Sequence, residues 1–538
     1  MTRTSAFSID RCLILEFLAD ILAALSKRCV NMKLEQREFI GLNTTNPVSK
    51  RAEEIAQASP RPSAGKARYE FRLAFDVWAN DVRNEAMTLE NWPYDDIDDR
   101  TVDGIVRSLD LQAATGYNIV DLAGLWTTYA WPPDLTKVVD RDRQRRINQI
   151  LKAAHERKMK VVVFPSGILN WGMDEILKAH PELKTDNRHE MNPLLEESWK
   201  WQYKIFDYAA DNYDIDGYHL EAADQGRCKT PECLAKWPDD VAYYCYVTGV
   251  LADYLRRKDS SKLLIATLQG FGKWGQDFSA EQRASVVDLT AKVDCLFDQG
   301  HYKTYIPSGD WKEFIPKLHC AFGTSGGQWI YVNERWERTR WFLPYVGRTG
   351  RHIKELYEAG GRGVMYYQGP VANPSTEVNI AFGGRLMSDV DKSVGDALAE
   401  ALEHLYRPKN PAALAKLAGI YRRAEDSYFE QWNPERIAEF TKRPAASNLH
   451  ITNSFGASPG AAEYMMEPYL DTSGRLNYKE ALVGMYADLL TIQHDFNDQG
   501  RIGRIKHAIE EALVDINNIA VCKNEKQVWD DQSVGLQY

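Results

Sequence analysis

The sequence lacks long apolar runs. No stretch of about 18 uncharged apolar residues occurs, which is the length that a membrane-spanning helix requires, so we expect no membrane span. The first apolar run, residues 12–25, contains Glu16 and Asp20 and predicts an amphipathic helix rather than the core of a signal peptide. The segment from Met32 reads MKLEQREFIGL and is similar to a twin-arginine export start with one arginine replaced by glutamine. Two compartments therefore stay open, periplasmic or secreted on one side and cytoplasmic on the other.

Cysteine is also scarce, with 8 residues in a chain of 538. Six of them are scattered, which excludes the disulfide framework that holds small secreted domains together. Cys228 and Cys233 are close enough in sequence to pair across a loop. No second Cys/His pair follows at the spacing of a zinc site, so a loop disulfide or two free thiols is favoured over zinc. We expect neither a metal ion nor a cofactor.

Two nucleotide-binding motifs are absent. No G-x-G-x-x-G follows the first predicted strand, which reads FDVWAND, and no G-x-x-x-x-G-K-[ST] occurs. The net charge of −10 also makes nucleic acid an unfavourable partner. Tryptophan, in contrast, is abundant, with 15 residues. Most of these indoles are expected in the core, but sugar sites also use them as stacking platforms.

Short apolar runs alternate with amphipathic helical stretches. The eight runs that we predict to be strands are 71–77, 117–122, 160–164, 215–220, 263–268, 293–297, 328–332 and 363–367. Alternating strands and helices predict a parallel sheet in the α/β class. Eight repeats predict a closed (β/α)8 TIM barrel, which typically takes about 250 residues. An open, doubly wound sheet is the alternative, and the missing glycine motif weakens it.

Composition divides the chain into three parts. Residues 1–66 are a polar N-terminal segment that ends in a linker-like stretch, ASPRPSAG at 58–65. Residues 67–387 are expected to form the barrel. Residues 388–538 contain four amphipathic helical patterns and predict a C-terminal all-helical domain. We regard these helices as a candidate surface for a homodimer.

Polar and aromatic residues follow most of the predicted strands. The carboxyl ends of the strands face the active site in such barrels. Acids and amides there can bind sugar hydroxyls, and indole rings can cover C–H faces. We expect at least one of Trp126, Trp171 and Trp274 to stack on a ligand. The candidate substrate-binding residues are Asp76, Trp78, Trp126, Trp171, Asp224, Trp274, His301, Lys303 and Tyr367.

Three carboxylates at strand ends are candidates for chemistry. Cleavage of a glycosidic bond needs two carboxyl groups beside the anomeric carbon, one that donates a proton and one that stays charged. Glu221 follows the apolar run IDGYHL and is the candidate proton donor, because a partly dry setting favours the protonated form. Asp298 and Glu334 follow strands six and seven and are candidates for the base.

Each candidate carboxylate also has an ordinary structural alternative. Glu221 and Asp224 can be loop charges, with Asp224 capping the next helix. Asp298 can be a loop acid bonded to His301, and Glu334 can form a salt bridge with a nearby arginine. His301 is also a candidate ligand for a sugar hydroxyl.

Three segments resemble the α-glucuronidases that trim xylan and related barrel proteins. They read GYHLEAADQGRCKTPEC, GGRGVMYYQG and AFGGRLMSDVDKSVGDALAEALEHLY, and the resemblance covers residues 68–407. In that family a glutamate after strand four is the general acid, an aspartate and a glutamate further on are base candidates, and the reaction inverts configuration. By this resemblance the three roles fall on Glu221, Asp298 and Glu334.

The sequence therefore predicts a glycoside hydrolase that removes a terminal, acidic sugar from a polysaccharide or oligosaccharide. Lys303, His301, Arg335 and Arg362 are candidate partners for a substrate carboxylate.

Two other classes stay open. One is a sugar-binding barrel that has lost its acid pair, and the other is a lyase that uses His301 and Tyr302 as base and acid. A hexosaminidase is disfavoured, because strand four ends Leu220-Glu221-Ala222 without the adjacent Asp-Glu pair of that family.

Overall fold

The computed structural model describes residues 67–75, 97–126, 131–222, 226–268, 278–298, 314–327, 342–344, 346–367, 374–430 and 472–521. These residues belong to one compact unit, Ser59–Tyr538.

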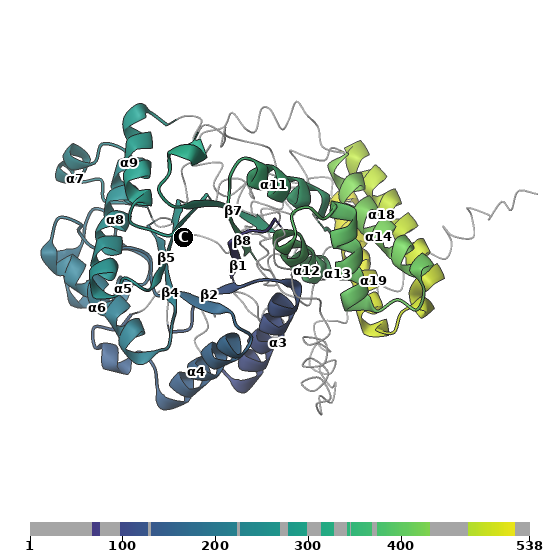
Figure 1. Cartoon of the computed structure of the whole chain (residues 1–538), viewed down its shortest axis with the longest axis horizontal. Helices are drawn as coiled ribbons and strands as arrows, with labels where there is room; N and C mark the ends of the chain where they lie inside the picture. Colours follow the sequence, from purple (N-terminus) through teal and green to yellow (C-terminus); the bar gives the residue numbers. More distant parts are fainter. Residues whose placement is uncertain are drawn as a thin grey trace, which may run out of the picture. The chain divides into compact units, whose positions relative to one another are not determined.

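Eight parallel strands close into a barrel in chain order, with β1 paired to β8, so the predicted (β/α)8 architecture is confirmed (Figure 1). Three predicted strands match the structure at both ends, namely 160–164, 263–268 and 363–367. The strands are β1 (Phe71–Phe75), β2 (Ile119–Ala123), β3 (Lys160–Phe164), β4 (Gly217–Glu221), β5 (Leu263–Leu268), β6 (Cys295–Asp298), β7 (Ala321–Gly327) and β8 (Gly363–Tyr367).

Helices follow the strands along the chain and surround the sheet (Figure 1). Those of the barrel are α3 (Asp99–Thr115), α4 (Arg141–Glu156), α5 (Asp174–Ala179), α6 (Glu196–Asn212), α7 (Pro231–Lys236), α8 (Asp240–Lys258), α9 (Ala280–Thr290), α11 (Val346–Glu358) and α12 (Pro374–Ser388).

Local sequence explains where several of these helices begin and end. The side chain of Asp98 accepts the Thr101 N–H at the start of α3, and Ser279 forms a capping box with Gln282 at the start of α9. Such caps satisfy backbone donors that have no partner inside the helix. Helix α3 ends at Gly116 with φ of 117°, a left-handed conformation that glycine adopts without strain.

Successive side chains of a strand point to opposite faces of the sheet. The buried apolar residues of the barrel therefore form two separate hydrophobic clusters, one on each face. The larger cluster lies between the sheet and the helices. The smaller cluster consists of alternate strand residues and fills the barrel. Its members are Phe71, Leu73, Ile119, Ala123, Val162, Phe164, Ile265, Cys295, Phe297 and Met365.

The prediction of the seventh strand was wrong. We expected it at 328–332, but β7 is Ala321–Gly327, with the glycine-rich sequence AFGTSGG. The reason is packing between neighbouring strands. Phe297 of β6 lies opposite Gly323 of β7, and a Cβ at Gly323 would lie 2.4 Å from Cε1 of Phe297. The Phe297 ring thus occupies the space that a side chain on β7 would need. The sequence signal for an ordinary strand is correspondingly weak at this position.

Four further helices follow the barrel, and the predicted all-helical C-terminal part is confirmed. They are α13 (Val394–Tyr406), α14 (Pro411–Phe429), α18 (Thr472–Ile492) and α19 (Gln499–Val521). Glu377 of α12, only 6% exposed, is held by Arg501 and Arg504 of α19 at 2.9 and 2.8 Å. Charge pairing therefore joins α19 to α12, the last helix of the barrel. The predicted boundary at 387/388 falls at the end of α12, and the homodimer stays a prediction.

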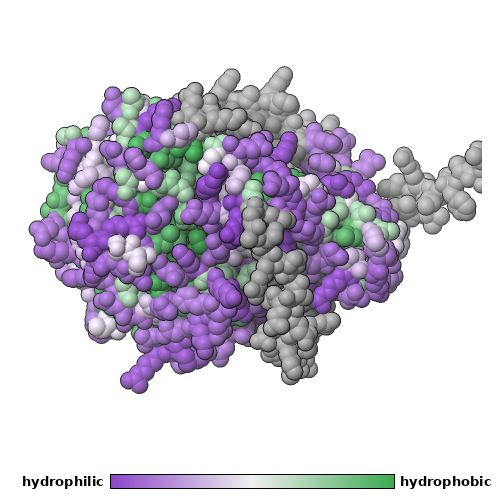
Figure 2. Space-filling model, in the orientation of Figure 1, coloured by the Kyte–Doolittle hydropathy of each residue, from purple (hydrophilic) through white to green (hydrophobic). Residues whose placement is uncertain are grey.

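The face shown in Figure 2 is mostly hydrophilic, with hydrophobic residues showing in a few places. No helix among the described residues is long and apolar enough to cross a membrane.

Candidate active site

Glu221 is the last residue of β4, so its predicted place at the carboxyl end of the fourth strand is confirmed. In the β4–β5 register, His219 lies opposite Ile265 and Glu221 lies opposite Thr267. Ile265 belongs to the cluster that fills the barrel, so His219, Glu221 and Thr267 share the inner face. The Glu221 side chain is 7% exposed, which places the carboxyl group at the rim of the packed interior.

The Glu221 carboxyl group is bonded from the neighbouring strand. The Thr267 hydroxyl donates to Oε2 of Glu221 at 3.0 Å. Nε2 of His219 lies 2.9 Å from the Thr267 hydroxyl oxygen and 3.4 Å from the same Oε2. Oε2 of Glu221 thus faces the Thr267 hydroxyl and the His219 imidazole, both on strands of the barrel.

A buried ion pair lies beneath this contact. Nδ1 of His219 is 2.5 Å from Oδ2 of Asp121 on β2, and both side chains are fully buried. Phe164 of β3 stacks beside the imidazole, with ring centroids 5.3 Å apart. The two strands that carry the pair are therefore bridged inside the barrel across β3.

Burial and charge act in opposite directions on this pair. Burial raises the pKa of Asp121, and the positive charge and hydrogen bond of His219 offset part of that rise. Burial lowers the pKa of His219, but the charge and hydrogen bond of Asp121, together with the charge of Glu221, outweigh it, so the His219 pKa is raised. The charge of Asp121 therefore favours the protonated form of the imidazole.

Asp121 and His219 were not assigned a role from the sequence. Asp121 lies in the predicted strand 117–122, and His219 lies in the apolar run IDGYHL before Glu221. The usable signal was their spacing: His219 and Glu221 are two residues apart in a strand, so they point to one face. The contact between β2 and β4 needed the folded barrel.

Two of the predicted tryptophans lie among the described residues, and they differ in exposure. Trp126 is 3% exposed, and its ring centroid lies 6.3 Å from that of Trp131 and 5.2 Å from that of Tyr213. Trp171 is partly exposed and packs edge-on against Phe164, at 5.6 Å, beside the cluster that fills the barrel. Of the two, Trp171 is better placed to reach a ligand at the barrel mouth.

The other candidates either are described by their backbone alone or lie outside the described residues. Asp298 and Tyr367 are the last residues of β6 and β8, but only their backbone is described. The remaining candidates lie outside the described residues: Asp76, Trp78, Asp224, Trp274, His301, Lys303 and Glu334, with Tyr302 and Arg335. Their roles stay predictions.

Arg362 was wrongly predicted as a partner for a substrate carboxylate. It immediately precedes β8, at the amino end of the strand. Its guanidinium donates to the carbonyls of Tyr357 and Gly361 and lies 4.4 Å from the Tyr357 ring centroid. It therefore belongs to the end of the barrel opposite Glu221.

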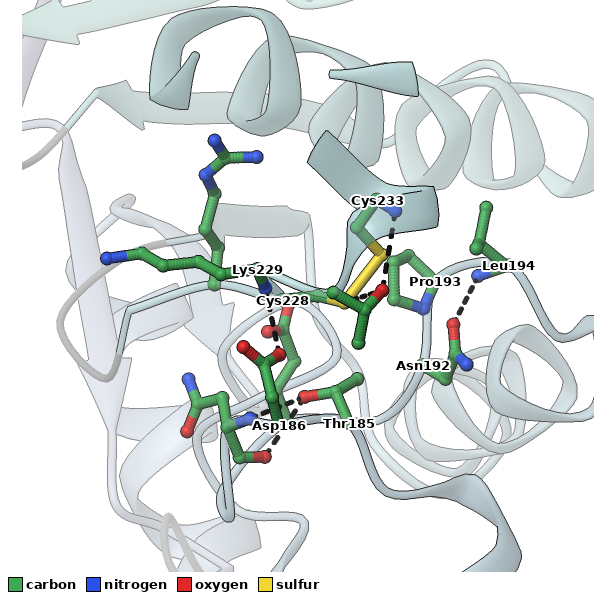
Figure 3. The surroundings of a disulfide bond; sticks show 12 residues. Thr185, Asp186, Asn192, Pro193, Leu194, Cys228, Lys229 and Cys233 are labelled. Carbon is green, nitrogen blue, oxygen red and sulfur yellow. Dashed lines mark hydrogen bonds between the residues drawn. A yellow bond between two sulfur atoms is a disulfide. The ribbon is translucent and has the colours of Figure 1, made fainter. Parts of the chain in front are cut away.

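Cys228 and Cys233 form a disulfide, which decides between the two arrangements left open by the sequence (Figure 3). Both residues are fully buried, and the bridge spans the start of α7, which Thr230 caps. The Lys229 N–H donates to Asp186 at 2.8 Å, and Figure 3 shows the loop with Thr185 and Asp186 on one side of the bridge and Pro193 on the other. The disulfide thus fixes the chain a few residues after Glu221.

A second buried carboxyl group lies in the loop between α5 and α6. Glu190 is fully buried and accepts a hydrogen bond from the Tyr243 hydroxyl. Burial raises the pKa of Glu190 to about 8; the Tyr243 bond opposes this rise, and the charge of Asp186 adds to it. Sequence reasoning missed this group, because nothing in the loop's composition indicates burial.

No group of three or more His, Cys, Asp or Glu side chains that could hold a metal ion occurs within the described parts of the chain.

No protein-family model and no curated protein matches this sequence. Solved structures do resemble it in fold. A GH138 enzyme that targets pectin rhamnogalacturonan II has a TM-score of 0.53 and 12% identity, with 89% of this chain and 75% of that chain covered. A point mutant of the Thermobaculum terrenum O-GlcNAc hydrolase gives 0.48 and 10%, with 87% of each chain covered, and CpGH84B gives 0.44 and 11%, with 87% and 73% covered. At these identities the first likeness supports the barrel fold alone.

Proposed function

We propose that this protein is a glycoside hydrolase in which Glu221 is one of the two carboxyl groups that cleave the bond. The observation that carries this proposal is the place of Glu221, at the carboxyl end of β4 and bonded from inside the barrel by Thr267. Active sites of (β/α)8 barrels lie at that end. A GH138 enzyme that targets pectin rhamnogalacturonan II shares the fold, which supports a carbohydrate substrate.

The second carboxyl group is proposed to be Asp298 or Glu334. Asp298 ends β6, and all strands of a parallel barrel end at the same rim. β7 ends at Gly327, so Glu334 follows it by seven positions, rather than two as expected from the predicted strand. This longer separation favours Asp298 as the first residue to test.

The substrate is proposed to be a terminal, acidic sugar of a polysaccharide or oligosaccharide, as in the α-glucuronidases that the sequence resembles. Lys303, His301 and Arg335 are proposed to meet its carboxylate. Trp171 is proposed to stack on the ring, because it is partly exposed beside Phe164.

The test is a screen of the purified protein against plant and algal oligosaccharides with acidic and neutral ends, read by mass. Hydrolysis adds one water across the two products, whereas a lyase adds none and leaves an absorbing double bond. Glu221→Gln is the matched control, because it keeps the shape of the side chain. Cleavage that persists at the wild-type rate in Glu221→Gln would contradict the role of Glu221, and binding without any cleavage would favour a sugar-binding barrel.

A further inference from the structure

A continuous line of buried polar groups crosses the inside of the barrel under Glu221. It runs from Asp121 on β2 through His219 on β4 and Thr267 on β5 to Oε2 of Glu221. The three contacts measure 2.5, 2.9 and 3.0 Å. Asp121 and His219 are fully buried, and Thr267 is 2% exposed. Buried groups at hydrogen-bond distance can pass protons directly to one another.

Counting protons defines one arrangement of this line. The Thr267 hydroxyl has a single proton, which it donates to Glu221. Nε2 of His219 must then carry its own proton to bond the Thr267 oxygen at 2.9 Å. In the protonated imidazole Nδ1 carries the second proton, and its positive charge lies 2.5 Å from Oδ2 of Asp121. Glu221 is a charged carboxylate in this arrangement.

A second arrangement has the same protons and the same total charge. The Nε2–H bond of His219 breaks as the proton passes to the Thr267 oxygen, and the hydroxyl proton of Thr267 passes to Oε2 of Glu221. Glu221 is then a neutral acid, and His219 keeps only the proton at Nδ1. No co-reactant is needed, because each proton moves between two groups already in contact.

We propose that Asp121, His219 and Thr267 are positioning residues that form a proton-sharing line, through which His219 supplies the proton that Glu221 gives to the leaving group. The proton that the attacking water loses replaces the one that the leaving group gains, which restores the line. The proposal rests on the proposed function in one respect, namely that Glu221 gives its proton to a leaving group. Asp121 holds the imidazole from the far side and stabilises its protonated form.

The groups around the line fit this role. The titratable side chains that face His219 include Asp121 from β2 and Glu221 from β4. β3 contributes the Phe164 ring, and β5 contributes the neutral Thr267. The imidazole therefore lies between two carboxyl groups, one at each of its ring nitrogens.

The decisive variant is Thr267→Val, which keeps the shape of the side chain and removes the hydroxyl. Thr267→Ser restores a hydroxyl and is the rescue. Thr248→Val is the matched control, because Thr248 is a fully buried threonine on α8, outside the line. Melting temperature and circular dichroism of all three establish that each variant is folded.

The first readout is the rate in mixtures of light and heavy water. The wild type and Thr267→Ser are expected to show a curved dependence of kcat on the fraction of heavy water, because more than one proton moves. Thr267→Val is expected to show a straight dependence and a kcat about 10- to 100-fold lower. This loss is smaller than the roughly 10²–10⁴-fold of general acid–base assistance, because Glu221 itself remains. Curvature and kcat unchanged in Thr267→Val would overturn the proposal.

The second readout does not depend on activity. ¹⁵N NMR of the His219 imidazole, assigned with His219→Gln, reports whether Nε2 carries a proton. The wild type is expected to show a shift between those of a protonated and a bare nitrogen, and Thr267→Val a shift at one extreme. A wild-type shift at one extreme at every pH would overturn the line, whereas a protein that cleaves no glycoside but shows the averaged shift would overturn only the proposed function.

Discussion

Asp121 and His219 approach to 2.5 Å inside the barrel, although their strands are not neighbours and β3 lies between them. Removing one partner of a buried ion pair leaves an uncompensated charge, whereas removing both does not. The pair therefore constrains both stability and the charge beside Glu221.

We expect Asp121→Ala to lower the free energy of unfolding by about 3–5 kcal/mol at neutral pH, because the His219 charge loses its buried partner. The double variant Asp121→Leu/His219→Phe should recover much of this loss while activity stays low. Denaturant unfolding of Asp121→Leu, His219→Phe and the double variant that combines them measures the coupling. Strictly additive losses would show that the contact contributes nothing.

Glu221→Gln is expected to lower kcat/KM by about 10²–10⁴-fold for substrates with poor leaving groups, because general acid assistance is lost. Substrates with an activated phenol need little protonation and should lose less. The measurement is kcat/KM against leaving-group acidity for wild type and variant. An equal loss for both kinds of substrate would make Glu221 a binding residue, and Asp224 would be the next acid to test.

Glu190 should make stability depend on pH. Its folded pKa of about 8 lies above the ordinary value of about 4.3, so its contribution is present at low pH and is lost as the pH rises through about 8. Glu190→Gln stays neutral at every pH. We expect the variant to gain stability relative to wild type between about pH 5 and 8, by up to a few kcal/mol at about 1.4 kcal/mol per pKa unit.

Urea unfolding at several pH values measures this gain. Asp186→Asn is the matched control, because it removes a nearby charge while Glu190 stays titratable. A pH-independent difference between Glu190→Gln and wild type would contradict the prediction.

Trp126 and Trp171 should respond differently to truncation. Trp126→Ala is expected to cost about 3–5 kcal/mol of stability, because it removes a ring from the packed core. Trp171→Ala is expected to weaken sugar binding about tenfold or more while the protein stays folded. Calorimetric titration with the best ligand of the screen, and thermal unfolding, separate the two effects. An unchanged sugar affinity in Trp171→Ala would show that this ring does not stack on the ligand.

Loss of the disulfide should loosen the loop after Glu221. The double variant Cys228→Ser/Cys233→Ser is expected to lose about 2 kcal/mol of stability, as the closure of a short loop predicts. Cys320→Ser, at a cysteine outside the disulfide, is the control. Equal unfolding midpoints for wild type and the double variant would show that the disulfide contributes nothing measurable to stability.

The sequence was sufficient for most of the barrel, because its strands are short apolar runs between amphipathic helices. β7 could not be found in this way, since it is rich in glycine, and at Gly323 the Phe297 ring of the preceding strand, β6, leaves no room for a side chain. The position of Glu221 at the end of β4 was predicted from its place after an apolar run, whereas its catalytic role stays a prediction. The Asp121–His219 pair was not, because a contact that crosses a barrel appears in no local spacing.

The packing of Phe297 against two glycines also restricts how this barrel can change. A Cβ at Gly323 would lie 2.4 Å from the Phe297 ring, and one at Gly363 would lie 3.0 Å from it. Cys295 Sγ also lies 3.0 Å from a Cβ at Gly363, and the Gly363 carbonyl oxygen lies 2.9 Å from one at Gly323. A side chain at either position therefore requires a smaller residue 297 together with a small shift of these neighbours. In related sequences we expect coupled substitutions at positions 297, 323 and 363. A larger side chain at 323 or 363 should accompany a smaller one at 297, so that the total side-chain volume inside the barrel is conserved.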